Sequence, residues 1–304
     1  MRKAKRFTPA LIRRYIDEGR GQGVHQNFTA FHQVGRADPP SRGTSSIIPA
    51  RGQLSTGHLL SVEEATVHEF TTMVPGVDDR RHQVRLSLDC HTNCLTEYSM
   101  WDDERIHPGT LDICRALHIK HPVLRRDGDL QDWIFTSDIV LTLLPRRQRR
   151  HMLAIAVKDV SFSQLKKRAR NLLKIEREFW LVQGHRWILV TPECFSPEVA
   201  EAVMRYAGFA HRAEPIDGGL LDLGATAVKR HGPQNLTVHL YGLMDEFRCD
   251  MERAQDLFWQ GVWTRRLPID WTSALWASDT IRFVSLAEFD TFNPVVSGRS
   301  AWPT

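Results

Sequence analysis

Four charged residues stand in stretches of the sequence that are otherwise apolar, and their types could bind a metal ion and cut a phosphodiester. They are Glu64, Asp138, Lys158 and Glu176. Hard oxygen ligands with no His or Cys among them favour Mg²⁺ or Mn²⁺ over zinc. A cation held by carboxylates can activate water, and a neighbouring lysine adds a positive charge at the transition state. The four residues therefore predict a metal-dependent nuclease.

Asp138 lies in the first of two apolar runs, and Lys158 directly follows the second. The runs are Ile134–Leu144 and Met152–Val157, and their β-branched content and short connection predict an antiparallel hairpin. A turn centred near Gln148 would pair Asp138 directly with Lys158, so that the two side chains share a face. A structural ion pair that only holds the hairpin together is the alternative explanation of these charges.

The two glutamates lie on predicted helices, on the sides that we expect to be buried. A helix over 61–73 carries Glu64 on its apolar stripe, although a capping box with Ser61 also accounts for a glutamate there. A second helix, over 163–183, carries Glu176 in the middle of its apolar stripe. Because a buried carboxylate needs a partner or a metal ion, we expect both glutamates to line one cleft.

The order of the predicted elements indicates an α/β fold. Strands predicted at Gln83–Leu88 and Trp187–Val190 join the hairpin and the helices in a mixed sheet flanked by helices. Later in the chain the pattern becomes mostly helical, with a clear helix over 250–265 and weak strands after it. We therefore expect a catalytic domain over 1–191 and a winged-helix-type domain over 192–304.

The composition is that of an ordinary globular protein, with 42% apolar and 25% charged residues among 304. The net charge of +4 and the pI near 8.9 are mildly basic, and the basic residues are clustered, as suits a polyanion such as DNA. No run approaches the ~20 apolar residues that span a bilayer, and the N-terminus lacks the apolar segment of a secretory signal. We expect a cytoplasmic protein.

The five cysteines are odd in number, and reduced thiols are the simplest account of them. A zinc site is a further alternative for part of this set, but the spacing fits no compact zinc knuckle. Its ligands would be Cys90, Cys94, Cys114 and His118.

Several motifs occur in the same order as in the TnsA endonuclease family of heteromeric cut-and-paste transposons, which this sequence resembles over most of its length. The motifs are Tyr15-x-x-Glu18-Gly-Arg-Gly-Gln-Gly23, His58–Glu64, Ile119–Val123, Thr136–Asp138, Val157–Lys158 and Glu176–Trp180. The resemblance implies a restriction-endonuclease-like amino-terminal domain and a winged-helix-type carboxy-terminal domain. It also implies that Glu64, Asp138 and Lys158 form the catalytic acidic pair and lysine. Glu176 matches the family's glutamate on the following helix.

One departure from the family pattern affects the expected metal site. Ala156 stands where the family has the glutamine of a glutamine-x-lysine motif. Alanine offers no side-chain ligand, so the expected ligands are Glu64, Asp138 and the backbone carbonyl of Val157, unless Glu176 takes a larger share. Because the acidic pair and the lysine are present, we expect an active enzyme that uses Mg²⁺, with Mn²⁺ as the alternative.

The resemblance also implies a division of labour between several proteins. A TnsA-like subunit cuts the 5′ strands of double-stranded DNA at transposon ends, a TnsB-like transposase cuts and joins the 3′ strands, and a TnsC-like AAA+ ATPase regulates them. Such a protein would be bacterial and associated with the nucleoid. Basic residues beside the cleft are expected to contact phosphates without reading bases. They are Arg146, Arg147, Arg149, Arg150, Lys166 and Lys167.

Two other functions are compatible with the same residues. The first is a stand-alone restriction or repair nuclease, which would cut DNA with Mg²⁺ and no partner. The second is a non-catalytic subunit that binds DNA or assembles the complex, an alternative that Ala156 makes worth testing.

Overall fold

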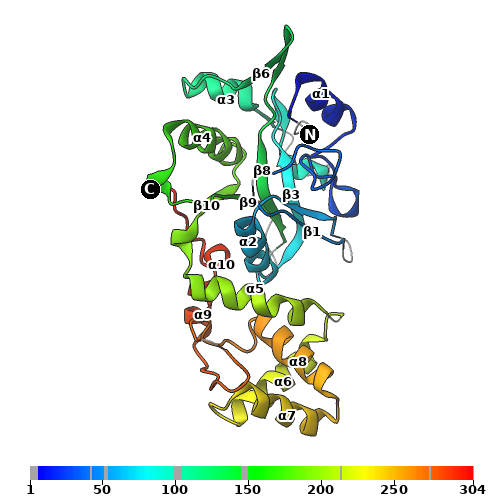
Figure 1. The fold of residues 1–304 in the computed structure, drawn as a ribbon, viewed down its shortest axis with the longest axis vertical. Helices are drawn as coiled ribbons and strands as arrows, with labels where there is room; N and C mark the ends of the chain where they lie inside the picture. Colours follow the sequence, from blue (N-terminus) through cyan, green and yellow to red (C-terminus); the bar gives the residue numbers. More distant parts are fainter. Residues whose placement is uncertain are drawn as a thin grey trace, which may run out of the picture. The chain divides into compact units, whose positions relative to one another are not determined.

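The computed structural model describes residues 6–41, 43–50, 54–98, 105–144, 150–212, 214–273 and 275–303. The chain divides into two compact units (Figure 1). The first comprises Met1–Ala65, Gly76–Thr191 and Ala301–Thr304, and the second comprises Thr66–Pro75 and Pro192–Ser300. The sequence predicts a boundary after Thr191, and the structure divides the chain there too. It differs from the prediction in assigning residues 66–75 to the second unit and 301–304 to the first.

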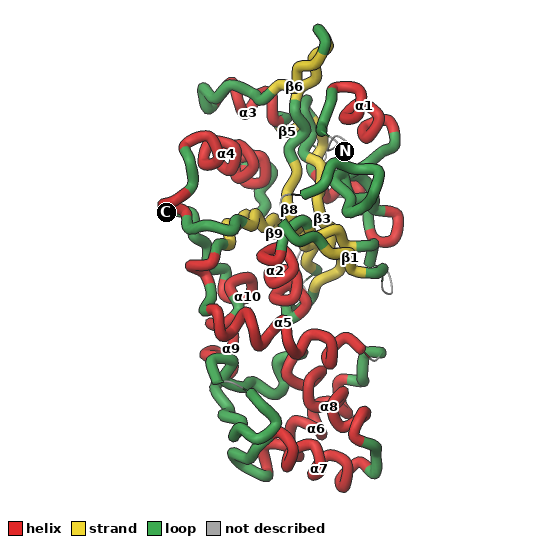
Figure 2. The backbone as a smooth tube through the Cα atoms, viewed as in Figure 1, coloured by secondary structure: helices red, strands yellow, loops and turns green. Residues whose placement is uncertain are grey.

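A four-stranded mixed sheet forms the centre of the first unit (Figure 2). Its strands, in spatial order, are β10 (Arg186–Val190), β9 (His151–Val157), β8 (Thr136–Leu143) and β3 (Val77–Arg85). β8 pairs antiparallel with β3 and β9, whereas β9 and β10 are parallel. Parallel neighbours need a crossover connection, and α4 (Lys167–Leu181) supplies it. The prediction of an α/β fold with a mixed sheet flanked by helices is confirmed.

The predicted hairpin of β8 and β9 is present, but the predicted register is wrong by two residues. The strands pair Ile139 with Ile155 and Leu143 with His151, and continuing this register puts Asp138 opposite Ala156 instead of Lys158. The connecting sequence contains no Asn-Gly or other glycine turn that would fix its centre. Because side chains alternate with a period of two, an error of two residues leaves the predicted faces unchanged.

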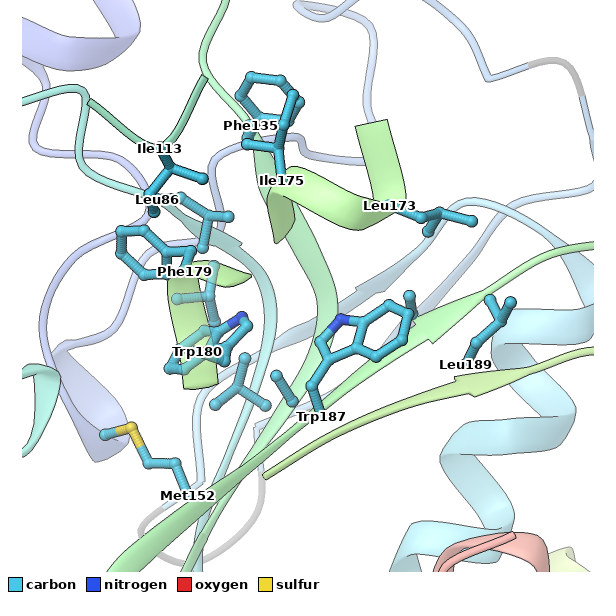
Figure 3. Close-up of a cluster of buried hydrophobic side chains, with 14 of the residues drawn as sticks. Leu86, Ile113, Phe135, Met152, Leu173, Ile175, Phe179, Trp180, Trp187 and Leu189 are labelled. Carbon is cyan, nitrogen blue, oxygen red and sulfur yellow. The ribbon is translucent and has the colours of Figure 1, made fainter. Parts of the chain in front are cut away.

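Apolar side chains of α4 and the sheet form one buried cluster (Figure 3). Trp180 of α4 and Leu189 of β10 are both 0% exposed, and burying an apolar side chain of this size contributes about 1.5–3 kcal/mol. The cluster thereby fixes α4, which carries Glu176, against the strands. The other cluster residues labelled in Figure 3 are Leu86, Ile113, Phe135, Met152, Leu173, Ile175, Phe179 and Trp187.

Short elements surround the sheet in the first unit. The helix α1 (Pro9–Asp17) begins at Thr8, whose side chain accepts a hydrogen bond from the Leu11 N–H. The other short elements are β1 (Ser46–Ile48) with β2 (Gly57–Leu59), β4 (His91–Thr92) with β5 (Ile106–His107), β6 (Val123–Arg126) with β7 (Asp129–Asp132), the helix α3 (Thr110–Ala116), and the 3₁₀ turns His25–Asn27, Cys94–Glu97 and Phe162–Gln164.

The helix α2 (Val62–Thr72) contributes residues to both units. Its first turn belongs to the first unit, and its residues from Thr66 onward belong to the second. Within the second unit, the Trp263 indole N–H donates to the Thr72 hydroxyl at 2.8 Å, and the Asn293 amide donates to the Phe70 carbonyl at 2.8 Å. These bonds fix the later turns of α2.

The second unit is helical. Trp259 and Trp263 of α8 are 1% and 4% exposed, and Trp259 stacks on Tyr206 at a centroid distance of 4.1 Å, so these tryptophans form part of the core of the second unit. The residues described between 192 and 303 include two isolated β-bridges but no strand. The helices are α5 (Pro197–Arg212), α6 (Gly218–Arg230), α7 (Leu236–Phe247), α8 (Met251–Trp263), α9 (Leu286–Phe292) and α10 (Pro294–Ser297), with a 3₁₀ turn at Pro192–Cys194.

Across the described parts of both units, no helix combines the length and the apolar character that crossing a membrane requires.

Candidate active site

The structure brings the four predicted catalytic residues together in the first unit. Asp138 is the third residue of β8, Lys158 directly follows β9, Glu64 lies in the first turn of α2, and Glu176 lies within α4. The charge of Asp138 acts on the pKa of each of the other three. The four side chains therefore form one electrostatic cluster.

Asp138 stands where β8 and β9 stop pairing. The last main-chain pair before it joins Ile139 to Ile155. Beyond that pair the Asp138 carboxylate accepts a hydrogen bond from the Val157 N–H at 2.8 Å and lies 3.4 Å from the Lys158 ammonium. The carboxylate thus replaces a main-chain acceptor at the point where the strands separate.

The Lys158 ammonium is bound to the Val157 carbonyl oxygen, which the sequence predicts to be a metal ligand. Its Nζ donates to the Val157 carbonyl at 2.5 Å, while its own backbone N–H donates to the Val190 carbonyl at 3.1 Å. Burial lowers the pKa of the Lys158 ammonium, but the surrounding carboxylates, Asp138 foremost, outweigh burial and raise it. Lys158 is therefore a fixed positive charge in this state and not a proton acceptor.

Glu64 is buried, and its hydrogen bonds support the helix-capping role, one of the two roles that the sequence left open. Its Oε2 accepts from the Leu60 N–H at 2.9 Å, and its own N–H donates to the Ser61 hydroxyl at 3.1 Å, so the residue does cap the start of α2. Burial, followed by the charge of Asp138, raises the pKa of Glu64 to about 8. A carboxyl that is difficult to ionise without a cation suits a metal ligand.

Glu176 is 7% exposed, as is Glu64, and two hydrogen bonds that meet at the Ser137 hydroxyl hold it in place. The Ser137 hydroxyl donates to Glu176 Oε1 at 2.7 Å, and the Trp180 indole N–H donates to the same hydroxyl at 2.8 Å. Burial and the charge of Asp138 raise the pKa of Glu176 to about 7. One oxygen of Glu176 is already bound to Ser137. Glu176 is therefore better placed to influence the electrostatic potential of the site than to be the main ligand of a metal ion.

Gln83 is a site residue that the sequence analysis missed. It lies on β3 between the pairs His82–Ile139 and Val84–Ser137, directly across from Asp138. Its amide donates to Glu64 Oε2 at 3.2 Å and accepts from the Thr136 hydroxyl at 3.3 Å. Gln83 is 1% exposed, and its φ of 55° is unusual for a residue other than glycine. No feature of the sequence indicates this backbone conformation.

The Thr136–Asp138 motif ties three neighbouring elements to the site. Thr136 donates to Gln83 on β3, Ser137 donates to Glu176 on α4, and Asp138 accepts from the backbone N–H of Val157, the last residue of β9. Three consecutive side chains thereby position three different parts of the cluster, which gives each residue of the motif a separate physical role.

Ala156 leaves no polar side chain on the β9 side of the site. It is 0% exposed and aligns with Leu189 of the parallel strand β10, within the apolar cluster under α4. The oxygen atoms that could hold a cation are therefore carboxylates of Glu64 and Asp138 and the Val157 carbonyl, the last once Lys158 releases it.

The donor chemistry fits Mg²⁺ or Mn²⁺. Three carboxyl groups face one ammonium, and the raised pKa values of Glu64 and Glu176 reflect burial and the charge of Asp138, which a divalent cation would offset. The described residues contain no group of three His, Cys, Asp or Glu side chains arranged to hold a metal ion. Two side-chain ligands and one carbonyl would leave the remaining positions to water and substrate, as is usual for Mg²⁺.

The residues proposed to contact DNA are only partly described. Arg146, Arg147 and Arg149 lie outside the described residues. Arg150 forms an ion pair with Asp78 at 3.2 Å, so its charge is already compensated. Lys166 and Lys167 are exposed at the start of α4.

The structure disperses the four residues of the alternative zinc site. Cys90 is exposed and donates to Asp112 Oδ2 at 3.2 Å, whereas Cys114 is 2% exposed in the apolar cluster under α4. Burial raises the pKa of Cys94 to about 12 and that of Cys114 to about 11, so neither thiol readily becomes the thiolate that binds zinc.

No protein-family model matches the chain, and no curated protein matches its sequence.

Proposed function

We propose that the protein is a metal-dependent DNA endonuclease. The observation that carries the proposal is the convergence of Glu64, Asp138 and Glu176 on one ammonium group, with a raised pKa at both glutamates. A divalent cation would favour the ionised form of such crowded carboxyl groups, so the cluster suits a metal ion. Within this class, we propose a TnsA-type subunit that cuts the 5′ strands at transposon ends. The ordered motifs of the sequence support this more specific assignment.

The residues of the site divide the work of phosphodiester hydrolysis. Glu64, Asp138 and the Val157 carbonyl would hold Mg²⁺, which supplies an activated water and stabilises charge on the phosphate when bound. Lys158 keeps its proton and places a positive charge beside the reacting phosphate. Gln83 orients Glu64, and Ser137 orients Glu176, so the carboxylates are preorganised before the DNA arrives.

The finer fold assignments belong to the same proposal. A restriction-endonuclease-like core is supported by the mixed sheet with α4 crossing between β9 and β10. For residues 192–304 we propose a winged-helix-type module, in which the isolated bridges Asn235–Thr280 and Ile269–Phe283 mark where short strands would pair. Its proposed roles are contact with DNA, a TnsB-like transposase and a TnsC-like AAA+ ATPase.

The test is to map both strand cuts at a transposon end in a mixture that contains the partner transposase. Asp138→Ala is expected to abolish the 5′ cuts and leave the 3′ cuts in place. Asp159→Ala is the matched control, because Asp159 is an exposed carboxylate one residue beyond Lys158. Unchanged 5′ cleavage by Asp138→Ala would show that the catalytic assignment is wrong.

The same experiment separates the alternatives. A non-catalytic assembly subunit, which the buried Ala156 favours, would support transposition equally well as wild type and as Asp138→Ala. A stand-alone nuclease would instead cut linear DNA efficiently with Mg²⁺ and no partner, and Asp138→Ala would remove that activity.

A further inference from the structure

A basic cavity lies beside the first turns of α4 in the first unit. Its volume is about 520 Å³, which is within the range of small-ligand sites. Four cations line it, over a floor formed in part by Ile119, Pro122, Val123 and Leu172. The cations are Lys120, Arg125, Lys167 and Arg168. His118, His121 and Asn171 complete the lining, so no acidic side chain is among the described residues around the cavity.

The four cations lack the carboxylate partners that the buried arginines Arg20 and Arg81 have. Arg20, for example, pairs with Asp38 at 2.9 Å, and Arg81 pairs with Glu97 at 2.8 Å. Within the described residues, none of the four cavity cations has an ion-pair partner, and all four are exposed. Like charges gathered without counter-charges repel one another, and a bound polyanion relieves that repulsion.

The cavity continues into a second hollow toward β8. The second hollow has a volume of about 320 Å³ and shares Arg168 and Leu172 with the first. Its far wall is Trp133, which lies shortly before β8 in sequence and stacks against His32 at a centroid distance of 6.0 Å. The two hollows together form a groove, defined here by the residues of both linings and called the α4 groove.

The helix α4 carries residues of both the α4 groove and the acidic site, so the rise of the helix gives the distance between them. Lys167 and Glu176 are nine residues apart on α4, which corresponds to about 13 Å at a rise of 1.5 Å per residue. One DNA strand advances only about 3.4 Å along the duplex axis per nucleotide, so a phosphate within a few nucleotides of one held at the acidic site can reach the α4 groove.

We propose that the α4 groove binds the backbone of the DNA strand that is cut, within a few nucleotides of the scissile phosphate. This inference rests on the proposed nuclease function, and it assigns a DNA-binding role to Lys120, Arg125 and Arg168, which were not among the residues predicted to contact phosphates. Lys and Arg side chains bind phosphate through charge and hydrogen bonds. Because the groove contacts backbone alone, it positions the duplex without selecting its sequence.

The test measures binding of the full-length protein to a short DNA duplex across a salt series, with Ca²⁺ in place of Mg²⁺. Lys120→Gln and Arg168→Gln, from two different elements, are each expected to weaken binding and to reduce the slope of log K against log salt by about 0.9 per lost phosphate contact. Lys174→Gln is the control, because Lys174 is an exposed cation of α4 outside both linings.

A position scan then locates the contact on the DNA. Single neutral methylphosphonates, placed one to eight nucleotides on either side of the cut, should weaken wild-type binding most at a position within a few nucleotides of the cut, and should not weaken Arg168→Gln further at that position. Unchanged affinity and salt slope in both groove variants would overturn the proposal, as would preferential binding of a free mononucleotide in the groove. If Asp138-dependent cleavage persists, the nuclease assignment survives that outcome. Groove-dependent binding by a protein that never cuts would instead refute only the nuclease assignment.

Discussion

Replacing Glu64 with glutamine separates the carboxylate's role as a cation ligand from its role at the start of α2. Glutamine has nearly the same shape and keeps an oxygen that can accept the hydrogen bonds from the Leu60 N–H and Gln83, but it carries no charge at any pH. In the absence of metal, the variant is therefore expected to be more stable than the wild type at neutral and alkaline pH.

The magnitude follows from the pKa of Glu64. Burial and the charge of Asp138 raise it from the ordinary value of 4.5 to about 8, so the folded protein keeps a proton that the unfolded chain has already lost. Wild-type stability consequently falls as the pH rises through this window. At about 1.36 kcal/mol for each pKa unit, the loss is about 3 kcal/mol at pH 7 and approaches about 5 kcal/mol above pH 8. The glutamine variant avoids this loss.

The assay is urea unfolding at pH 5, 7 and 9, with EDTA or with excess Mg²⁺. Glu64→Gln and wild type should differ little at pH 5 and by several kcal/mol at pH 9 in EDTA, and Mg²⁺ should stabilise the wild type selectively. Glu63→Gln is the control, since Glu63 is the preceding carboxylate of the same helical turn. Parallel pH dependence of Glu64→Gln and wild type, or equal stabilisation by Mg²⁺, would refute the reasoning.

Three further predictions concern the same cluster. Gln83→Leu removes the acceptor of the Thr136 hydroxyl and one of the two donors to Glu64. We expect a loss of about 1–3 kcal/mol in urea unfolding and a higher pH optimum for cleavage, because an amide donor no longer favours the ionised Glu64. Lys158→Met should reduce the single-turnover cleavage rate at saturating Mg²⁺ by about 100-fold or more, and an undiminished rate would exclude Lys158 from catalysis. Mg²⁺ affinity should rise about tenfold per pH unit for each proton released between pH 6 and 8, and then level off as Glu64, with a pKa of about 8, ionises. Calorimetry in two buffers of different ionisation enthalpy measures the released proton.

The sequence predicts much of this site because a charge in an apolar pattern is a local property. Asp138 interrupts the apolar pattern of β8, and Glu176 interrupts the buried stripe of α4, whose neighbours Ile175 and Phe179 are 0% and 1% exposed. Such interruptions can be read without knowing which elements are neighbours in space. For the same reason the mixed sheet could be predicted from the element order alone.

Other features depend on tertiary contacts, and the sequence does not predict them. Gln83 has a positive φ at the point where its amide joins Glu64 of α2 to Thr136 of β8. The hairpin register depends on a connection with no turn signature. The assignment of Thr66–Pro75 to the second unit agrees with hydrogen bonds from Trp263 and Asn293, which lie 191 and 223 residues after their partners in the chain.

The bond between the Lys158 ammonium and the Val157 carbonyl has a consequence for the order in which the site is assembled. An ammonium that shares its surroundings with Asp138, Glu64 and Glu176 is a built-in counter-ion, and it lets the carboxylates remain close together before any metal arrives. On the proposed function, Lys158 would have to leave the Val157 carbonyl before that oxygen could hold a metal ion, and a DNA phosphate could accept the released ammonium. Metal and DNA would then each strengthen the binding of the other, and cleavage would require both.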